Sequence, residues 1–500
     1  MISRVPFYPA LFAILPVLAL YASNADLFPL AQLWRPVIVV VVASAVLTAV
    51  LSLVLRSAVR GGAAALVAIL ALYAYSTFAG WVSSETESST ALLYWLIASL
   101  LLMALAAWKV RVLRGFNVLA LAMTAVAVGQ VTYARNSVSR AAAAERSQVA
   151  ANAKPKENLP DIYYIVLDGY GRTDQLERAL GYSNRDFIEE LEKRGFFIAK
   201  RSVPNYCQTQ LSVFSSVNMD YIQSLLPKLD KNSDDRTPIV NGIRESAVAS
   251  AFRSCGYRVM GIGSGFPGVP FATDDLSVVN RPGLTLLETY LLQMTPFGAT
   301  QRAVESLFDA HRNRALTAFE TLEELDKPAA TPRLVFVHIL GPRPPFAFDR
   351  DGNPGKRLGG YTIADASLLL NGITADQYKE GYADQATFIN RRLLQMIDRL
   401  LAGHPDPPII ILQGDHGSKV GFDMESLEKT DLKEAFSILN ALLVPDSIRA
   451  RLTDELAPVN TFRIIASDLL GLDLPLRPAR AYYSTHNRPF VFTDVTDRVR

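Results

Sequence analysis

Three short motifs in the C-terminal two thirds of the chain carry side chains that bind metal ions or contact phosphoryl groups. Asp168 follows an apolar run and precedes a Gly-Tyr-Gly turn. Gly-Asp-His-Gly at 414–417 follows a second apolar run. His338 lies in a third, which continues into Gly-Pro-Arg-Pro-Pro at 341–345. Two carboxylates and an imidazole brought together would form a divalent-cation site with mixed oxygen and nitrogen ligands.

Each of these residues also has an ordinary structural explanation. Asp168 and Asp415 can cap a helix or a turn, which is the common role of aspartate after a strand. His338 lies inside an apolar strand, where a hydrogen-bonded core histidine fits as well as a ligand. The other three histidines outside the Asp-His pair carry no motif: His311, His404 and His486. We expect the first two in solvent and the third in a structural role.

A candidate nucleophile precedes a helix of small residues. Thr209 follows the loop 202–208 and stands at the predicted start of that helix. Backbone N–H groups and the helix dipole at such a position stabilise an alkoxide or a phosphate. Thr209 can instead be a plain helix N-cap, and Cys207 is a rival nucleophile two residues earlier.

The elements that must position these motifs are short apolar strands alternating with helices from residue 161 onward. Continuous apolar strands separated by helices predict an α/β fold with a doubly wound, mostly parallel sheet. Ligands bind such sheets at the carboxyl ends of the strands, where all three motifs lie. The predicted strands are 162–167, 196–200, 257–262, 334–340, 409–412 and 437–444. The predicted helices include 184–193, 245–254, 375–401 and 461–470.

The first 134 residues have a different composition. They hold only ten of the chain's 50 basic and 48 acidic residues, and half of the whole chain is hydrophobic. A helix crosses the hydrocarbon core with about 20 apolar residues. Five such runs predict a five-helix transmembrane bundle: 7–24, 37–55, 63–82, 91–108 and 116–133. The remainder is near neutral in charge, which excludes nucleic acid as a partner because phosphate binding needs a basic excess.

The charges of the connecting loops predict the orientation of the bundle. Arg56, Arg60 and the basic loop 109–114 mark cytoplasmic connections, whereas the acidic loop 83–87 lies on the other side. With Arg4 also inside, five crossings place the N-terminus in the cytoplasm and the α/β domain outside it. The first run can instead be a cleaved signal peptide, which would leave the domain on the same side. The bundle can be only an anchor, or it can provide access to lipid.

These boundaries divide the chain into three parts. A transmembrane domain at 1–134 is followed by an Ala-rich, charged juxtamembrane linker at 135–160 and an extracytoplasmic domain at 161–500. Within the last part, the segment 284–299 has one charge and fits a helix lying on the membrane surface or a buried helix. Cys207 and Cys255 can form a disulfide by number, although their spacing does not indicate one.

The order of the motifs resembles the sulfatase branch of the alkaline phosphatase superfamily. The resemblance rests on Leu-Asp-Gly at 167–169, the Thr209 helix, His-x-x-Gly-Pro at 338–342 and Gly-Asp-His-Gly at 414–417. The five-helix anchor is similar to membrane-bound lipoteichoic acid synthases and phosphoethanolamine transferases. The resemblance implies an alkaline phosphatase-like catalytic domain and a bacterial cytoplasmic membrane location, with several membrane crossings.

The resemblance also implies roles for individual residues. Thr209 matches the metal-bound nucleophile, and the other matched metal ligands are Asp168, Asp415 and His416. Asp168 replaces the glutamate common in the transferases. Leu334 replaces an aspartate of two-metal relatives, so one Zn or Mn ion is expected. Arg343 stands where relatives have a histidine; with His338 and Arg172 it is expected to bind substrate and balance charge.

The implied activity is transfer of a phospholipid head group, of the phosphoglycerol or phosphoethanolamine type, to an envelope glycan or lipid. A phosphorylated Thr209 would be the intermediate, with a membrane phospholipid as donor. A phosphodiesterase or sulfatase-like hydrolase is the alternative within enzymes. Cys207 lacks the Pro and Arg of the sulfatase motif Cys-x-Pro-Ser-Arg, which disfavours sulfatase chemistry. A catalytically impaired membrane binding module is the third alternative, because Arg343 cannot act as a general acid.

Overall fold

The computed structural model of this chain describes residues 6–23, 30–82, 88–109, 114–144, 153–264, 266, 269, 271, 284–359, 361 and 372–499. Contacts divide the chain into two compact units, each described by itself. Unit 1 comprises Met1–Ala141 and Gly283–Leu307, and unit 2 comprises Ala142–Pro282 and Phe308–Arg500. Some expectations fall outside the described residues: Arg4, the loop 83–87, Arg111 and linker residues 145–152.

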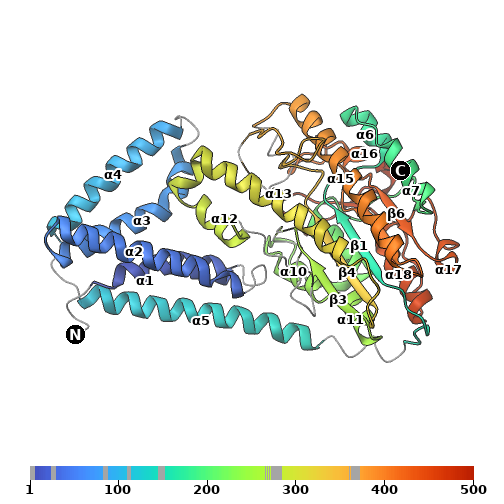
Figure 1. The fold of residues 1–500 in the computed structure, drawn as a ribbon, viewed down its shortest axis with the longest axis horizontal. Coiled ribbons are helices and arrows are strands. Elements are labelled where there is room, and N and C mark those ends of the chain that lie inside the picture. Colours follow the sequence, from blue (N-terminus) through green and yellow to red (C-terminus); the bar gives the residue numbers. More distant parts are fainter. Residues whose placement is uncertain are drawn as a thin grey trace. The chain divides into compact units, whose positions relative to one another are not determined.

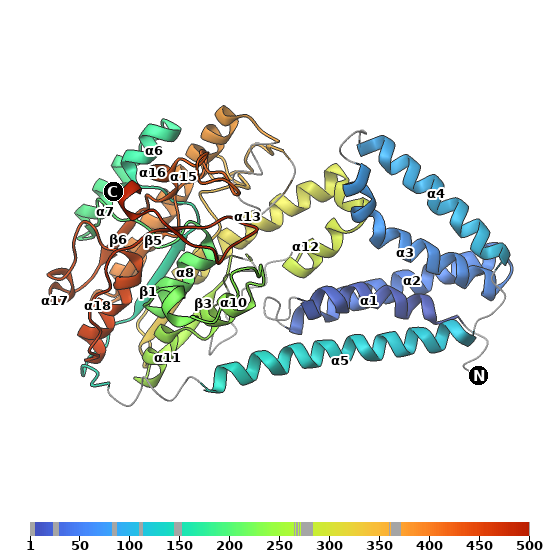
Figure 2. The same cartoon turned by 180° about the vertical axis from the view of Figure 1, so that it is seen from behind.

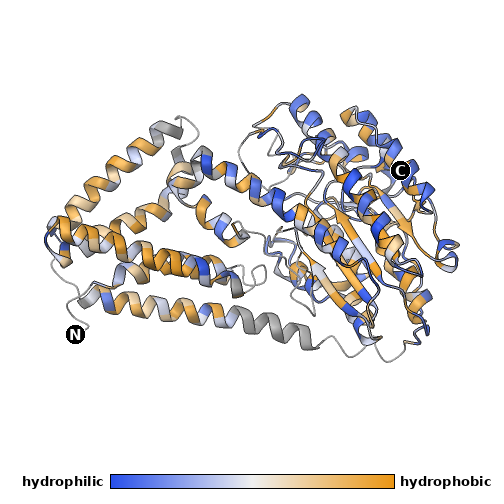
Figure 3. Ribbon diagram, in the orientation of Figure 1, coloured by the Kyte–Doolittle hydropathy of each residue, from blue (hydrophilic) through white to orange (hydrophobic). Residues whose placement is uncertain are grey.

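Unit 1 begins with five apolar helices (Figures 1 and 3). They are α1 (Tyr8–Ser23), α2 (Trp34–Val54), α3 (Ala58–Val82), α4 (Ser88–Lys109) and α5 (Arg114–Ala144), with a 3-10 turn at Leu30–Gln32. Four of these, α2 to α5, are long and apolar enough to cross a membrane. The prediction of five spans is corrected to four of that length, because α1 has 16 residues and is about 24 Å long, against a hydrocarbon core of about 30 Å.

Unit 1 also contains a helix from the second half of the chain. This helix, α12 (Leu286–Gln293), precedes the 3-10 turn Pro296–Ala299 and helix α13 (Gln301–Glu324), whose first residues belong to the same unit. Leu287 and Leu291 of α12 are buried in one hydrophobic cluster with residues of α1 and α5: Val17, Leu18, Tyr21, Ala127 and Val131. The segment 284–299 thus carries a helix that is partly buried, in line with the buried-helix alternative, but it packs on the apolar helices of unit 1 and not in the α/β domain.

Unit 2 is built on a six-stranded sheet in the order β2-β6-β5-β1-β4-β3. The four strands β3, β4, β1 and β5 are parallel. Strand β6 pairs antiparallel with β5, and β2 pairs antiparallel with β6, so β2 again runs in the direction of the four. The predicted mostly parallel α/β sheet is therefore confirmed, with one strand, β6, running opposite to the other five. The strands are β1 (Ile162–Leu167), β2 (Phe197–Ile198), β3 (Arg258–Ile262), β4 (Arg333–Ile339), β5 (Ile409–Gly414) and β6 (Asn440–Leu443).

Helices cover both faces of this sheet, as a doubly wound fold requires. On one face Tyr164 and Val166 of β1 pack with α8 (Thr209–Asn218), α11 (Ala247–Ser254) and α18 (Pro458–Leu470). On the other face Tyr163 and Ile165 pack with α13 and α15 (Ala375–Gly403). Figures 1 and 2 show these two layers from opposite sides.

Shorter elements complete unit 2. They are α6 (Thr173–Leu180), α7 (Arg185–Lys193), α9 (Ile222–Leu225), α10 (Thr237–Arg244), α16 (Leu432–Ala435), α17 (Asp446–Arg449) and α19 (Thr496–Val499). A two-stranded ribbon joins β7 (Tyr482–Tyr483) to β8 (Thr493–Asp494).

Two histidines expected in solvent are buried. His404 is the C-cap residue of α15. It lies near the amino ends of the central strands, with its Nε2 3.2 Å from Oδ2 of Asp161. Asp161 in turn pairs with Arg333 in a buried ion pair. His311 lies on α13, where its ring nitrogen contacts the carbonyl of Leu340 at 3.3 Å. The local sequence suggested exposure because the neighbouring residues are polar, but the helix face that carries each histidine is packed.

Candidate active site

The register of the sheet brings the three motifs to one edge. Strand β1 lies between β4 and β5, and Leu167 pairs with Ile339 on one side and Gly414 on the other. Asp168 and Asp415 therefore follow neighbouring strands at the same level. His338 pairs in register with Val166, one residue deeper in the sheet. Two carboxylates, of Asp168 and Asp415, and two imidazoles, of His338 and His416, therefore lie at one edge of the sheet.

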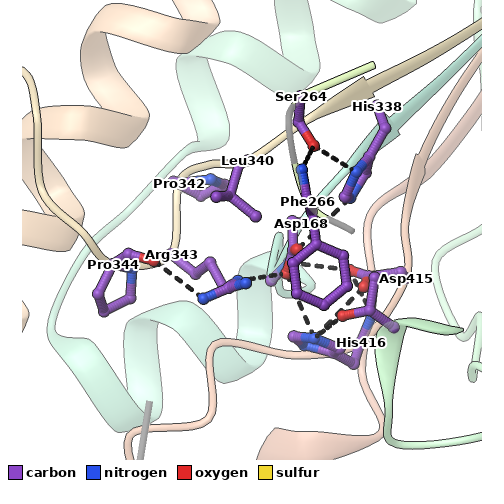
Figure 4. A network of polar contacts seen from close by, with 12 residues as sticks. Asp168, Ser264, Phe266, His338, Leu340, Pro342, Arg343, Pro344, Asp415 and His416 are labelled. Atoms are coloured by element: carbon purple, nitrogen blue, oxygen red, sulfur yellow. Dashed lines mark hydrogen bonds and ion pairs between the residues drawn. The ribbon is translucent and has the colours of Figure 1, made fainter. Parts of the chain in front are cut away.

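Asp168, Asp415 and His416 form a compact cluster (Figure 4). One ligand atom from each lies within 4.8 Å of the others, and all three side chains are buried. The Nε2 atom of His416 is 3.4 Å from Oδ1 of Asp168 and 3.3 Å from Oδ2 of Asp415. Oδ2 of Asp168 and Oδ2 of Asp415 lack a hydrogen-bond partner. Unsatisfied buried carboxylate oxygens are costly unless a cation compensates them.

Backbone groups set the orientation of these ligands. Oδ1 of Asp415 accepts hydrogen bonds from the backbone N–H groups of Gly169 and His416, at 2.9 and 3.0 Å. The Nδ1 atom of His416 lies 2.9 Å from the carbonyl of Gly417. A carbonyl can only accept, so Nδ1 carries a proton, and in the neutral tautomer that a metal ligand needs Nε2 has the lone pair. That lone pair faces the cluster.

The donor set fits a divalent metal ion. It offers carboxylate oxygens and a neutral imidazole nitrogen whose other nitrogen is fixed by hydrogen bonding, which is the usual arrangement of a metal-binding histidine. Such mixed oxygen and nitrogen sites suit Zn and Mn. The predicted ligands Asp168, Asp415 and His416 are therefore brought together by the fold.

Thr209 lies beside this cluster. It is the first residue of α8, and its Oγ1 is 3.1 Å from Nε2 of His416. The N-cap position belongs to Gln208, whose side chain makes no capping hydrogen bond, so Thr209 is not the cap. Cys207, the rival nucleophile, is buried with its Sγ 3.8 Å from the carbonyl of Ser484. Cys207 and Cys255 form no disulfide with each other.

Arg343 contacts the cluster from the loop after β4. Its Nε donates to Oδ1 of Asp168 at 2.7 Å, and its guanidinium lies 5.6 Å from the ring of Phe266 (Figure 4). Burial alone would raise the pKa of Asp168, but Arg343, together with His338 and His416, overcomes this and holds that pKa well below its usual range. Asp168 is therefore ionised at neutral pH, as a metal ligand must be.

His338 completes the described cluster. Its Nε2 is 3.4 Å from Oδ2 of Asp168, and its Nδ1 is 2.8 Å from the hydroxyl of Ser264. Ser264 also accepts the N–H of Phe266 at 3.1 Å. The ring is thus held in one orientation at the edge of the site, rather than serving as an ordinary core residue.

Arg172 lies apart from these residues in the structure. Its guanidinium pairs with Asp174 at 2.6 Å and donates to the carbonyl of Ser202 at 3.3 Å. The expectation that Arg172 balances charge on the substrate stays a prediction.

The sequence did not reveal the residues that support the Arg343 loop. Gln385 of α15 donates to the carbonyl of Arg343 at 2.9 Å and accepts the N–H of Ala347 at 2.7 Å. Gly169 has a φ of +76°, and a side chain there would meet Arg343 at 2.8 Å. The one signal in the sequence was the spacing of Gln385, which falls on the apolar face of the predicted helix. That spacing indicates a buried amide, but it does not tell which loop the amide contacts.

Comparisons with known proteins give structural similarities alone. No family model matches the chain. No curated protein matches it. Among solved structures, the C-terminal periplasmic domain of EcEptC from Escherichia coli, in complex with Zn, is 14% identical; the match covers 69% of this chain and 95% of that chain, with a TM-score of 0.41.

Two further structures illustrate the range of similar proteins. Lipooligosaccharide phosphoethanolamine transferase A from Neisseria meningitidis, an integral membrane protein, is 14% identical over 93% of this chain and 96% of that chain, with a TM-score of 0.39. A phosphonate monoester hydrolase of Agrobacterium radiobacter is 15% identical over 65% and 80%, with a TM-score of 0.40. At this similarity these structures assign neither a family nor a substrate to this chain.

Proposed function

We propose that this protein is a membrane-anchored, metal-dependent phosphotransferase that moves a phospholipid head group through a phosphorylated Thr209. The observation that carries the proposal is the position of Thr209: its Oγ1 lies at the start of α8 and 3.1 Å from His416. His416 belongs to the carboxylate cluster, and the helix start favours negative charge on the hydroxyl oxygen and on phosphate. A nucleophile, a cation site and an anion-stabilising helix thus coincide.

Asp168, Asp415, His416 and Thr209 would hold one Zn or Mn ion. When bound, such an ion lowers the pKa of a hydroxyl and offsets the charge of a phosphodiester. The residues of the chain then orient the reaction. Thr209 attacks phosphorus, and the head group becomes covalently bound while the lipid alcohol leaves. A hydroxyl of the acceptor next attacks the phosphothreonine and restores Thr209.

Arg343 and His338 would contact the transferring group. The guanidinium of Arg343 has donors besides the Nε that bonds Asp168, and a planar guanidinium suits phosphoryl oxygens. We propose that it stabilises charge on the non-bridging oxygens, with His338 on the other side of Asp168. Arg343 remains protonated throughout, because a guanidinium does not lose its proton in proteins.

The apolar helices favour a donor that resides in the membrane. A phospholipid donor and an envelope glycan or lipid acceptor would both be reached from the bacterial cytoplasmic membrane. The packing of unit 1 supports a cytoplasmic N-terminus. Residues near the carboxyl end of α1 and in the middle of α5 share one cluster with α12, and α5 leads into unit 2. The amino end of α1 therefore lies at the opposite end of the bundle.

Two alternatives use the same site. A hydrolase would pass the phosphoryl group to water; sulfatase chemistry at Cys207 is disfavoured, since its sulfur contacts Ser484 while Thr209 contacts His416. A non-catalytic module is favoured by one observation, the ion pair of Arg343 with Asp168, in which a protein cation neutralises a metal ligand.

The test uses the full chain in detergent or nanodiscs. We expect metal analysis to find about one ion per chain and mass spectrometry to find phosphate on Thr209 after incubation with phosphatidylethanolamine or phosphatidylglycerol. Thr209→Ala abolishes the phosphopeptide and head-group release, whereas Thr209→Ser keeps part of both. Thr173→Ala, at the first position of α6, is the matched control and retains full activity. A metal-loaded protein that never phosphorylates Thr209 would support the binding module instead.

A further inference from the structure

Helix α10 lies beside α8, the helix that carries the candidate nucleophile (Figure 2). A side chain added at Gly242, near the end of α10, would meet the ring of Phe214 at 2.2 Å, so the two helices are in close contact. Nδ2 of Asn218, the last residue of α8, donates to the carbonyl of Gly242 at 2.9 Å. The N-cap residues of the two helices, Gln208 and Arg236, are also in contact. Both helices therefore begin at the same end of this pair.

Arg236 binds the side chains of the residues on both sides of Thr209. Its Nη2 donates to Oε1 of Gln208 at 2.6 Å, and its Nη1 donates to Oε1 of Gln210 at 3.0 Å. A guanidinium is planar and presents these two nitrogens in a fixed geometry, so it sets the spacing of the two amides. Thr209 lies between them in the chain, with its Oγ1 3.1 Å from Nε2 of His416. One side chain thus fixes the residues before and after the candidate nucleophile.

The same contacts join the start of α8 to the carboxyl-terminal segment. Nε2 of Gln208 donates to the carbonyls of Ser484 and Thr485 at 3.0 and 3.1 Å, and Arg236 donates to the carbonyl of His486 at 3.2 Å. Gln208 is buried, so the loss of one of these partners would leave a polar group without a hydrogen bond. One guanidinium and one amide therefore hold the first turn of α8 against a segment 276 positions away in the sequence.

The position of Thr209 makes this support important. The start of a helix is its least constrained part, because the first N–H groups have no partner within the helix and helix ends fray. Gln208 occupies the N-cap position of α8 without a side-chain capping bond. A nucleophile there keeps its place only if contacts from outside the helix fix the first turn. A displacement of about 1 Å can slow a reaction between positioned groups by about 100-fold.

We infer that Arg236 is a positioning residue that holds Thr209 in place for its attack on phosphorus, by binding Gln208 and Gln210. The inference rests on the proposed phosphotransfer. Because Arg236 fixes the geometry of the nucleophile, its loss lowers the rate of the chemical step and leaves the affinity for the donor unchanged. The effect is the same for every donor, since Thr209 attacks phosphorus in each case.

The first experiment measures the single-turnover rate of Thr209 phosphorylation in the full chain in detergent. The donors are phosphatidylethanolamine in micelles and the soluble ester p-nitrophenyl phosphoethanolamine, and the corresponding phosphoglycerol pair is measured in the same way. Arg236→Ala is expected to slow the maximal rate by about 10- to 100-fold with both kinds of donor. The donor concentration that gives half of the maximal rate stays unchanged. Arg236→Lys is slowed as well, because a single ammonium does not present two nitrogens in the geometry of a guanidinium.

The matched control is another arginine between the same two segments. Nη2 of Arg488 lies 3.3 Å from Oδ1 of Asn232, so it joins the carboxyl-terminal segment to the loop before α10. Arg488→Ala is expected to leave the rates with both donors unchanged. Hydrogen exchange measured by mass spectrometry without substrate gives a readout that does not depend on activity. The amides of residues 207–213 should exchange faster in Arg236→Ala, and those of β5 should not, because only the first turn of α8 is released.

A combined variant tests whether Arg236 acts through the two amides. Gln208→Ala with Gln210→Ala should be at least as slow as Arg236→Ala, and adding Arg236→Ala should slow it further by no more than about twofold, because the three side chains act as a unit. Multiplying losses would overturn the inference. So would a loss confined to the lipid donor, a changed half-saturating concentration at full maximal rate, or full activity of Arg236→Lys. Each of these results leaves phosphotransfer intact, whereas a wild type that phosphorylates Thr209 from neither donor overturns the proposed function and this inference with it.

Discussion

Asp168 is the residue on which the candidate site depends most, because it faces cationic or donor groups on several sides. Arg343 contacts Oδ1, His338 approaches Oδ2 and His416 lies beside both Asp168 and Asp415. A buried carboxylate that loses its cationic partner costs about 3 to 5 kcal/mol. A bound metal ion would share this role with Arg343, so the two cations should compensate for each other.

Arg343→Gln tests this compensation. We expect the variant to lose about 3 kcal/mol of stability in EDTA, where Asp168 keeps no full positive charge beside it, and clearly less with saturating Zn or Mn. Thermal unfolding of the full chain in detergent, with and without metal, measures the difference. Arg350→Gln removes an exposed arginine of the same segment, paired with Asp384, and should shift the midpoint little in either condition. An equal loss of stability with and without metal would show that no bound metal ion neutralises Asp168 together with Arg343.

At this scale the sequence predicted which side chains converge but not what holds them. Asp168, Asp415, His416 and Thr209 were identified because strand ends and a helix start place their backbones together. Ser264 and Gln385 were not, because each acts on a residue far away in sequence, His338 and Arg343. His404 was expected in solvent for the same reason, since its partner Asp161 lies 243 positions away.

Among the elements, α15 supports the loop that carries Arg343. Gln385 satisfies the carbonyl of Arg343 and the N–H of Ala347 with one buried amide. Gln385→Leu keeps the approximate volume but leaves both backbone groups unsatisfied, at about 1 to 3 kcal/mol each. We expect reduced stability together with a lower kcat for head-group release, because Arg343 loses its position.

The control for Gln385 lies on the same helix. Thr387 is exposed; its hydroxyl donates to the carbonyl of Ala383 and also contacts the hydroxyl of Tyr182, so Thr387→Ala should change stability little and leave kcat unchanged. Chemical denaturation and steady-state kinetics on phosphatidylethanolamine give the two readouts. If Gln385→Leu loses stability while kcat per folded molecule stays unchanged, α15 does not position Arg343 for the reaction.

At the amino ends of the strands we expect a substitution to lower stability without lowering activity. Asp161 and Arg333 form a buried ion pair where β1 and β4 begin, with His404 at 3.2 Å from the carboxylate. Asp161→Asn should cost about 3 kcal/mol and leave kcat per folded molecule unchanged, since the site lies at the carboxyl ends of these strands. Asp398→Asn breaks an exposed pair with Arg194 and should cost less than about 1 kcal/mol. A fall in kcat of Asp161→Asn would mean that the two ends are coupled.

The sequence located the strands better than it located their pairing. Apolar runs gave β1, β4 and β5 nearly to the residue, because these strands are buried on both faces and need continuous apolar sequence. The antiparallel pairing of β6 and β2 left no such mark, since Phe197–Ile198 is a pair of residues at an edge. The parallel bridge between Tyr206 and Tyr482 joins segments too short to show a period.

For the molecule as a whole, the segment around α12 has the least expected arrangement. It is inserted between β3 and β4, yet it packs on the apolar helices of unit 1. An apolar sequence with one charge fits a membrane surface or a core equally well, so composition could not decide. The single charge is informative in retrospect: Glu288 forms an ion pair with Arg35 at the start of α2 and is otherwise nearly buried.

This ion pair leads to a prediction about lipid substrates. The chain passes from α12 through α13 to β4, which precedes the loop of Arg343. Helix α12 packs on α1 and is paired with α2 through Glu288 and Arg35. If these contacts fix the position of this part of the chain, breaking the ion pair should slow the reaction of a donor in the bilayer more than that of a soluble donor. Arg35→Glu places two carboxylates together, and Glu288→Arg places two guanidinium groups together. Each should slow head-group release from phosphatidylethanolamine vesicles by about tenfold, the effect of roughly 1.4 kcal/mol, and leave p-nitrophenyl phosphoethanolamine turnover unchanged.

The reciprocal variant distinguishes the pair from general damage to the fold. Arg35→Glu combined with Glu288→Arg restores opposite charges, while the apolar contacts of Leu287 and Leu291 remain. We expect it to recover lipid turnover to within about threefold of the wild type, since the coupling of two charges in contact depends on their sign and not on which helix carries each. Loss of soluble-ester turnover in the single variants would contradict the prediction, because the described contacts of Arg35 and Glu288 lie in unit 1 and the candidate site is built entirely from unit 2.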